Sequence, residues 1–311
     1  MSTRPTVPSD PKVPSDRRPV TIPSLFEMKR AGTPIVMVTA YDYPSARAAE
    51  AADVDMVLVG DSGAMTVLGH SSTVAVTTDE MLVLTKAARR GVQHALLVAD
   101  LPFGSYEVSD EQAIATAIRF VKEAGADAVK LERGDASSIS RARAIVGAGV
   151  PVVGHVGLTP QSATSLGGYR AQGRTAESAM RIARGAVGLQ DAGCICIVFE
   201  AVPSALTAEL MNLMTVPIIG IGAGPATDGQ VLVFHDLLGI REGAGAKFVR
   251  RYADLQDAMD DGVAQYAKEV RSSVFPGPEH GYGIDEAELA KFRDAWDEST
   301  SYGADAFRPA Q

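Results

Sequence analysis

Short apolar runs alternate with helix-like segments along most of this chain, and no other feature restricts the possible folds as strongly. Helix-like segments such as 78–91, 109–124 and 175–192 separate the runs. Strands that alternate with helices pair in parallel through right-handed crossovers. An eighth strand is expected somewhere in 231–249, after seven predicted strands at residues 35–40, 56–60, 94–100, 128–132, 150–156, 194–200 and 216–222. We therefore predict a (β/α)8 TIM barrel of the α/β class, with an open doubly wound sheet as the alternative.

Composition narrows the class of protein. A length of 311 residues suffices for one large barrel or two ordinary domains. The net charge of −9 argues against nucleic-acid partners and anionic membrane surfaces, because both favour clustered Lys and Arg. No apolar run approaches the roughly 20 residues that span a bilayer, and the N-terminus lacks the apolar stretch of a signal peptide. Cys194 and Cys196 are too close for a structural disulfide, so we expect reduced thiols and a cytoplasmic protein.

Three segments are predicted from the distribution of Pro, Gly and apolar residues. Residues 1–20 hold five prolines and no periodic apolar pattern, so they are predicted to form a disordered N-terminal arm. The catalytic barrel is expected to occupy 21–275, and 276–311 to form a C-terminal extension. One helix is predicted there from Asp285 to Trp296, with an apolar face made of Leu289, Phe292 and Trp296. We expect this face to dock on the chain's own barrel or on a neighbouring subunit.

Several predicted strands end in polar side chains of the kinds that perform catalysis. These residues are Asp61, Ser62, Asp100, Lys130, Glu132, His155 and Glu200. The parallel strands of a barrel all end at one mouth, which is where the active sites of such barrels lie. We therefore expect these side chains to lie close together in one site.

Asp61, Asp100 and Glu132 would bring three carboxylates to this mouth. Oxygen ligands select a hard cation, and the chain shows no Cys–His set for zinc, so Mg²⁺ is the predicted metal. Without a cation, converging carboxylates repel one another and at least one takes up a proton. The alternative is that each carboxylate caps a helix or pairs with a nearby Arg.

Lys130 and Glu132 point the same way because strand side chains alternate, so both face the mouth. A buried Lys beside carboxylates favours an anion such as a substrate carboxylate, with a structural salt bridge as the alternative. Glu200 ends the most apolar strand, and desolvation there would make its carboxylate more basic, which suits a general base or acid unless it forms a structural ion pair. His155 also ends a strand and is either a further catalytic candidate or a satisfied structural residue.

Taken in order, the motifs at these positions resemble the ketopantoate hydroxymethyltransferase family. The matching stretches include Val38–Tyr43, Leu58–Ser62, Val98–Phe103, Val129–Glu132, Gly154–Ser162, Phe199–Pro203 and Gly220–Gly224. The resemblance covers about residues 20–280. One departure is Arg133-Gly134, which follows Glu132 where the family usually has two glycines.

This resemblance implies a (β/α)8 barrel, Mg²⁺ dependence and a cytosolic homo-oligomer, often a decamer of two stacked pentamers. It implies transfer of a one-carbon unit from the cosubstrate 5,10-methylenetetrahydrofolate to 3-methyl-2-oxobutanoate, which gives 2-dehydropantoate for pantothenate biosynthesis through a Mg²⁺-stabilised enolate. By motif, Asp61 and Asp100 correspond to Mg²⁺ ligands, with Glu132 completing the metal environment. Ser62 and Lys130, with the two aspartates, correspond to residues that hold the keto acid, and Glu200 corresponds to the proton acceptor.

Two other functions fit many of the same features. A Mg²⁺-dependent lyase or mutase of the phosphoenolpyruvate mutase and isocitrate lyase type shares an oxygen-ligated metal at strand ends. Such an enzyme usually carries a catalytic Cys in a mobile loop, whereas both cysteines of this chain lie inside a predicted strand. The other alternative is a catalytically inactive barrel used for binding, and the intact Asp61, Asp100, Lys130 and Glu200 argue against it.

Overall fold

The computed structural model describes residues 17–162, 168, 170–241, 243 and 245–300. Contacts divide the chain into a first unit that ends at Leu255 and a second unit that begins at Gln256. Of the predicted N-terminal arm, residues 1–16 lie outside the described residues. The predicted boundary between residues 275 and 276 falls inside the second unit.

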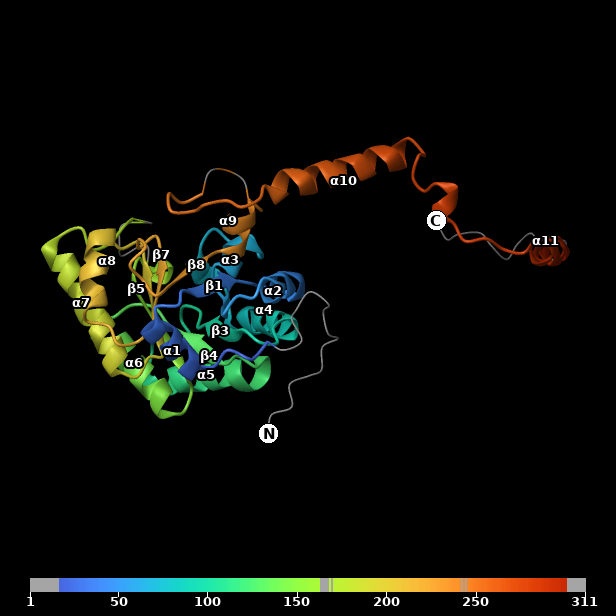
Figure 1. Ribbon diagram of the computed structural model, residues 1–311. Coiled ribbons are helices and arrows are strands. Elements are labelled where there is room, and N and C mark those ends of the chain that lie inside the picture. Colours follow the sequence, from blue (N-terminus) through green and yellow to red (C-terminus); the bar gives the residue numbers. More distant parts are fainter. Residues whose placement is uncertain (1–16, 163–167, 169, 242, 244, 301–311) are drawn as a thin grey trace. The chain divides into compact units, whose positions relative to one another are not determined.

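The first unit contains a closed barrel of eight parallel strands, so the predicted barrel is confirmed and the open-sheet alternative is wrong. The strands are β1 (Ile35–Thr39), β2 (Met56–Val59), β3 (Leu96–Asp100), β4 (Ala128–Lys130), β5 (Val152–Gly157), β6 (Cys196–Glu200), β7 (Ile218–Ile221) and β8 (Gly229–Leu232). Each strand pairs with the next along the chain, and β8 pairs with β1 to close the barrel. Figure 1 shows this first unit with its helices around the strands. All eight strands therefore end at one mouth.

The eighth strand is the one that the sequence pattern placed least well. β8 begins at Gly229, two residues before the predicted window of 231–249. The connection from β7 to β8 consists of residues 222–228, all of which are described, and it contains no helix. A crossover without a helix lacks the 3.6-residue period that marks where the next strand begins, so the pattern indicated no sharp boundary.

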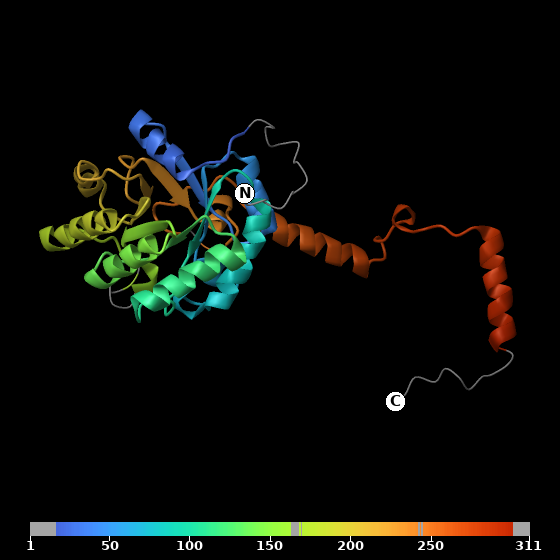
Figure 2. The same cartoon turned by 90° about the horizontal axis from the view of Figure 1, so that it is seen from below.

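Helices cover the outside of the barrel (Figure 2). They are α1 (Ile22–Ala31), α2 (Tyr43–Ala51), α3 (Gly63–Thr66), α4 (Thr78–Gly91), α5 (Asp110–Ala124), α6 (Ala136–Gly147), α7 (Ala176–Asp191), α8 (Ser204–Met211) and α9 (Phe234–Leu238), with 3-10 turns η1 (Thr73–Ala75) and η2 (Pro160–Ser162). Successive helices from α4 to α7 contact one another. Ser109 caps α5, because its side chain accepts a hydrogen bond from the backbone N of Gln112.

Side chains alternate along each strand between the barrel interior and the layer beneath the helices. In β2, for example, Met56 belongs to the interior cluster of buried residues, whereas Val57 packs beneath the helices. Leu25 of α1 also joins the interior cluster. Just before α1, the backbone N of Val20 donates to the carbonyl of His94, which precedes β3. The segment that contains α1 therefore lies at the N-terminal end of the barrel, and the C-terminal mouth is left for the site.

The second unit consists mainly of α10 (Leu255–Arg271), the turn η3 (Pro278–His280) and α11 (Glu286–Thr300). The predicted helix 285–296 corresponds to α11, which continues to Thr300. The rings of Phe292 and Trp296 stack with centroids 6.2 Å apart, and each side chain is 57% exposed. Docking of this face stays a prediction. Among the helices of the described residues, none combines the length and apolar character that a membrane span requires.

Candidate active site

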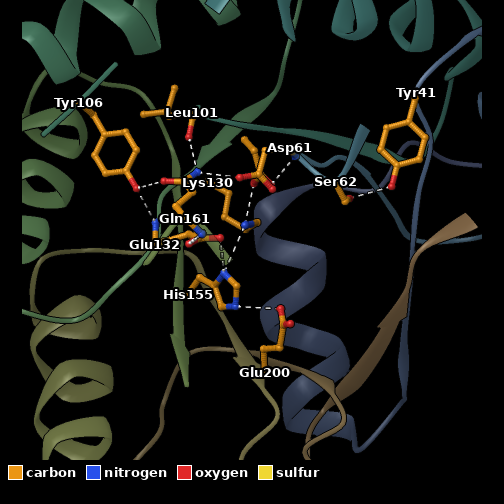
Figure 3. Close-up of polar contacts among 11 residues, drawn as sticks. Tyr41, Asp61, Ser62, Leu101, Tyr106, Lys130, Glu132, His155, Gln161 and Glu200 are labelled. Atoms are coloured by element: carbon orange, nitrogen blue, oxygen red, sulfur yellow. Dashed lines mark hydrogen bonds and ion pairs between the residues drawn. The ribbon is translucent and has the colours of Figure 1, made fainter. Parts of the chain in front are cut away.

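The C-terminal mouth of the barrel collects the residues predicted for the site. Asp100, Lys130 and Glu200 are the last residues of β3, β4 and β6. Each continues the inward-facing row of its strand, as Asp100 does after the interior residue Val98. Figure 3 shows Lys130 and Glu200 on opposite sides of His155. The structure therefore brings the predicted side chains together.

Asp61 lies two residues after β2 and is held close to Asp100. Its backbone N donates a hydrogen bond to Asp100 Oδ2 at 3.0 Å. Asp61 is 4% exposed and Asp100 is 2% exposed. Gly60 permits this approach, because a Cβ there would lie 2.8 Å from Ser62 Oγ and 3.6 Å from Asp100 Oδ2. The turn after β2 thus places two buried carboxyl groups at the same point of the mouth.

Lys130 forms an ion pair with Asp100, with 2.8 Å between Nζ and Oδ1. Both side chains are almost completely buried. Burial by itself lowers the pKa of Lys130, but the carboxylates of Asp100, Glu132 and Asp61 outweigh it and raise the pKa above its ordinary value. Lys130 is therefore charged, and the salt bridge expected as an alternative is present.

The two aspartates are costly to ionise in this environment. Burial raises the pKa of Asp61 well above its ordinary value, and the neighbouring charges of Glu132 and Asp100 raise it further. Burial also raises the pKa of Asp100, although Lys130 acts in the opposite direction. A bound cation stabilises carboxylates of this kind in their ionised form.

His155 lies between two carboxylates and Lys130. Its Nδ1 is 3.5 Å from Glu132 Oε1 and 3.4 Å from Lys130 Nζ, and its Nε2 is 3.3 Å from Glu200 Oε2. Burial lowers the pKa of His155, as does the Lys130 charge, but Glu132 and Glu200 outweigh both and raise it to about 9. His155 is thus protonated at neutral pH. The ion pair expected as an alternative for Glu200 is present, and the Glu200 side chain keeps 16% exposure.

Gln161, which was not among the residues predicted for the site, connects these carboxylates. Its Nε2 donates to Asp61 Oδ2 at 2.9 Å and to the Leu101 carbonyl at 3.0 Å. Its backbone N donates to Glu132 Oε2 at 3.0 Å. Tyr106 OH donates to Gln161 Oε1 at 2.6 Å (Figure 3). One buried residue therefore holds two carboxyl groups and a phenol in place, through its side-chain amide and its backbone N–H.

Tyr41 is a further residue without an assigned role, and its hydroxyl lies 2.8 Å from Ser62 Oγ. Tyr41 lies in the stretch Val38–Tyr43 and Gln161 in the stretch Gly154–Ser162, both of which match the family. This match was the only sequence feature that could have identified them. Tyr106 lies in the loop between β3 and α5, where no strand end or periodic pattern marks it. The sequence therefore contained a signal for two of these three residues.

The donor set fits a hard divalent cation. Asp61, Asp100 and Glu132 offer only oxygen ligands, and both cysteines are free and buried. Among the described residues, no group of three or more His, Cys, Asp or Glu is arranged as a ready-made metal site. Mg²⁺ commonly uses one or two protein carboxylates and takes its other ligands from water and substrate. The pair Asp61 and Asp100 satisfies that requirement.

Solved structures share the fold. A phosphonopyruvate hydrolase in complex with oxalate and Mg²⁺ aligns with a TM-score of 0.55 over 90% of this chain and 98% of its own, at 12% identity. A 2,3-dimethylmalate lyase, a member of the PEP mutase/isocitrate lyase superfamily, aligns with a TM-score of 0.54 over 91% of this chain and 99% of its own, at 15% identity. Identity this low shows a common barrel fold alone.

Sequence relatives are far more similar. The 3-methyl-2-oxobutanoate hydroxymethyltransferase of Moorella thermoacetica is 52% identical over 86% of this chain and 99% of its own length. The enzyme of Geobacillus kaustophilus is 50% identical over 85% and 94%. The mitochondrial enzyme 1 of Arabidopsis thaliana is 47% identical over 92% and 84%. The family model described as ketopantoate hydroxymethyltransferase matches residues 19–278, so the chain belongs to the ketopantoate hydroxymethyltransferase family of enzymes.

Proposed function

We propose that this protein transfers a one-carbon unit from 5,10-methylenetetrahydrofolate to 3-methyl-2-oxobutanoate and so produces 2-dehydropantoate in pantothenate biosynthesis. The observation that carries the proposal is that Asp61, Asp100, Lys130 and Glu200 meet in one barrel mouth. Asp61 and Asp100 offer ligands for a metal ion, and Lys130 offers a positive charge. Together they suit the carboxylate and keto oxygens of a 2-keto acid. Glu200 offers a base in the same mouth. The family match and the names of the relatives support the same reaction.

Asp61 and Asp100 would hold a Mg²⁺ ion, with Glu132 completing its environment. The bound ion would withdraw electrons from the carboxylate and keto oxygens of the substrate. Support comes from the aspartates themselves, since burial raises the pKa of both and a cation would relieve this cost. Glu132 is positioned for a supporting role, because Gln161 N donates to its Oε2.

Lys130 and Ser62 hold the keto acid in place. An ammonium group has three donors, so Lys130 can keep its ion pair with Asp100 and still donate to a substrate oxygen. Its positive charge stabilises the negative charge that develops on the keto oxygen when C3 loses its proton. Ser62 Oγ is oriented by the Tyr41 hydroxyl at 2.8 Å and supplies a neutral hydrogen-bonding group beside Asp61.

Glu200 removes the proton from C3 of the keto acid. Its carboxylate pairs with the protonated ring of His155, which restricts the orientation of the carboxylate. Glu200 comes from β6, whereas Asp61 and Asp100 belong to the ends of β2 and β3. The base therefore approaches the substrate from a different part of the mouth than the two aspartates that would hold the metal. After C3 loses its proton, this carbon attacks the methylene carbon of the folate.

Exchange of the C3 hydrogen in D2O tests this base without folate. With Mg²⁺, the unsubstituted protein should exchange the C3 hydrogen of the keto acid, and Glu200→Gln should do so about 10²–10⁴-fold more slowly while it still binds the keto acid. Glu209→Gln removes an exposed carboxylate on α8 and is the matched control. Exchange at the unsubstituted rate in Glu200→Gln would assign the base role to another group, with His155 first.

The same assay bears on the enolate mechanism as a whole. Absence of exchange in the unsubstituted protein, even with a folate analogue added to close the site, would contradict it. Cleavage of isocitrate or methylisocitrate would support the lyase alternative. Failure to bind Mg²⁺ in a titration with the keto acid would support an inactive barrel.

We also propose that the protein is a cytoplasmic homo-oligomer, with the decamer implied by the family resemblance as the expected assembly. Apolar side chains on one face of α10 support association: Met259, Val263, Tyr266 and Val270 are 52%, 69%, 57% and 44% exposed. Continuous exposed apolar surface of this kind is characteristic of association sites. The two free cysteines fit a reducing compartment.

A further inference from the structure

A cavity of about 470 Å³ opens beside the proposed active site, where β4 and β5 end and α7 begins. Its lining includes Arg133, Asp135, Gly157, Gln172, Arg181 and Arg184, and we refer to it as the arginine cavity. Its volume lies in the range of roughly 300–1,000 Å³ that is typical of small-molecule sites. None of its lining residues has a part in the chemistry proposed above.

The arginine cavity adjoins the residues proposed for catalysis. Gly157 is the last residue of β5 and pairs in register with Glu200. A Cβ at Gly157 would collide with the carbonyl oxygen of Glu200, so this part of the cavity wall contacts the backbone of the proposed base. On another side, the backbone of Arg133 pairs with that of His155 in an isolated antiparallel bridge. A ligand in the cavity therefore lies next to the keto-acid site.

The cavity is cationic although the whole chain carries a net charge of −9. Three Arg and one Asp line it, so the charged lining residues sum to +2. Arg133 forms a long ion pair with Asp135, with 3.7 Å between a guanidinium nitrogen and Oδ2. Arg181 forms a closer ion pair with Glu177, with 2.6 Å between a guanidinium nitrogen and Oε1. Arg184 is exposed and forms no ion pair with any residue in the described part of the chain. A cationic recess on an acidic protein attracts anions.

The backbone holds these guanidinium groups around one space. Arg133 has a φ of 74°, in the left-handed region that residues with a Cβ rarely adopt. Gly134 packs directly on α7, since a Cβ there would lie 2.6 Å from Gly185 Cα. This contact joins the loop that carries Arg133 to the helix that carries Arg181 and Arg184. Backbone strain maintained by surrounding contacts is a feature of ligand sites.

We infer that the arginine cavity binds the glutamate carboxylates of the folate cosubstrate, an inference that rests on the proposed function. The folate must bring its methylene carbon to C3 of the keto acid beside Glu200, and its glutamate lies at the far end of the molecule. Guanidinium groups bind carboxylates through paired, charge-assisted hydrogen bonds. The keto acid already has Lys130 as its cationic partner, so a separate cationic recess suits the second substrate.

The test compares two one-carbon donors: 5,10-methylenetetrahydrofolate and the corresponding tetrahydropteroate derivative, which lacks the glutamate. In the unsubstituted protein, the donor without glutamate should have a KM about tenfold higher, because a charged hydrogen bond is lost. Arg184→Gln should raise the KM for the folate about tenfold and leave the KM for the tetrahydropteroate donor unchanged. Arg181→Gln is the second variant. Arg143→Gln is the matched control, because Arg143 is an exposed residue of α6 outside the cavity lining. Its KM values for the two donors should equal those of the unsubstituted protein.

Equal KM values for the two donors in the unsubstituted protein would overturn the inference, and so would an equal rise for both donors in Arg184→Gln and Arg181→Gln. Inorganic phosphate is a separate probe. The protein could bind phosphate and lose this binding in Arg184→Gln, while the ratio of the KM values for the two donors stays the same in the variant. That result would assign the cavity to a phosphate-bearing ligand instead. C3 exchange in the unsubstituted protein needs no folate. Loss of exchange would count against the proposed function, whereas normal exchange without donor discrimination refutes the role of the arginine cavity alone.

Discussion

His155 Nε2 lies 3.3 Å from Glu200 Oε2, while the Nδ1 of the same ring faces Glu132 Oε1 at 3.5 Å. One imidazolium is therefore shared by the proposed base and a carboxylate of the proposed metal environment. Because this ring is buried, its charge depends on both partners, and the stability of the barrel mouth depends on that charge.

The metal-free protein is expected to lose stability as the pH rises from about 6.5 through 9. The pKa of His155 is raised from its ordinary value of 6.5 to about 9. Since the pKa is higher in the folded than in the unfolded state, the stabilisation is complete below the unfolded value and disappears as the pH passes the folded value. The shift corresponds to roughly 3 kcal/mol at most. Urea unfolding across this pH range, in the presence of a chelator, measures the free energy of unfolding.

His155→Gln is the control for this pH dependence. The variant should be less stable at neutral pH, because Glu132 and Glu200 lose a charged partner, but its stability should change little between about pH 6.5 and pH 9. The same slope in the variant and in the unsubstituted protein would mean that other groups titrate in this range.

Asp61→Asn should stabilise the metal-free protein and abolish its response to Mg²⁺. Burial and the nearby carboxylates raise the pKa of Asp61, so its ionised form costs stability at neutral pH. Asn keeps an oxygen that can accept from Gln161 Nε2, and the expected gain is about 1–2 kcal/mol. Thermal unfolding with and without Mg²⁺ measures both effects. Asp191→Asn, which neutralises an exposed carboxylate at the end of α7, should keep the Mg²⁺ response. An unchanged response in Asp61→Asn would remove Asp61 from the metal site.

Gln161 and Tyr106 should be energetically coupled. Gln161→Ala removes the donor to Asp61 Oδ2 and the acceptor of the Tyr106 hydroxyl, which is expected to cost about 1–3 kcal/mol for each group. Tyr106→Phe removes the phenol alone and should cost less. In a double-mutant cycle, the free energies of unfolding of the two single variants should differ from additivity by about 1 kcal/mol. Strict additivity would mean that the 2.6 Å hydrogen bond between them contributes nothing.

Val263→Asp should reduce the size of the assembly. Val263 is 69% exposed and lies in the apolar row on α10, so a charge there opposes its burial against another subunit. Ala264→Asp adds the same charge one residue away, outside this row, and should keep the assembly intact. Light scattering after size-exclusion chromatography gives the mass of each protein. Equal masses for both variants and the unsubstituted protein would exclude α10 from the interface.

The emission of Trp296 provides an independent readout of association, because it is the only Trp of the chain. Its side chain is 57% exposed and stacks on Phe292. If α11 docks on a neighbouring subunit, the emission should shift to longer wavelength on dilution as the assembly dissociates. Emission typical of full exposure at every concentration would contradict docking.

The sequence by itself determined the barrel and the inward-facing side chains at its mouth. Asp100, Lys130 and Glu200 each follow a short apolar run, and alternation along a strand is a local property of consecutive residues. Once parallel strands close into a barrel, that local rule places all three at one mouth. β8 begins two residues before its predicted window, because no helical period precedes it to mark where the strand starts.

Only the tertiary structure decided which partners these side chains meet. Tyr106 and Gln161 are 55 residues apart in loops after different strands, and the protonation of His155 depends on Glu132 and Glu200 together. The arginine cavity likewise depends on the contact of Gly134 with Gly185. Loops carry no repeating pattern that specifies which other loop they contact. Their pairing follows from the closure of the barrel, which brings strand ends that are distant in sequence within hydrogen-bonding range.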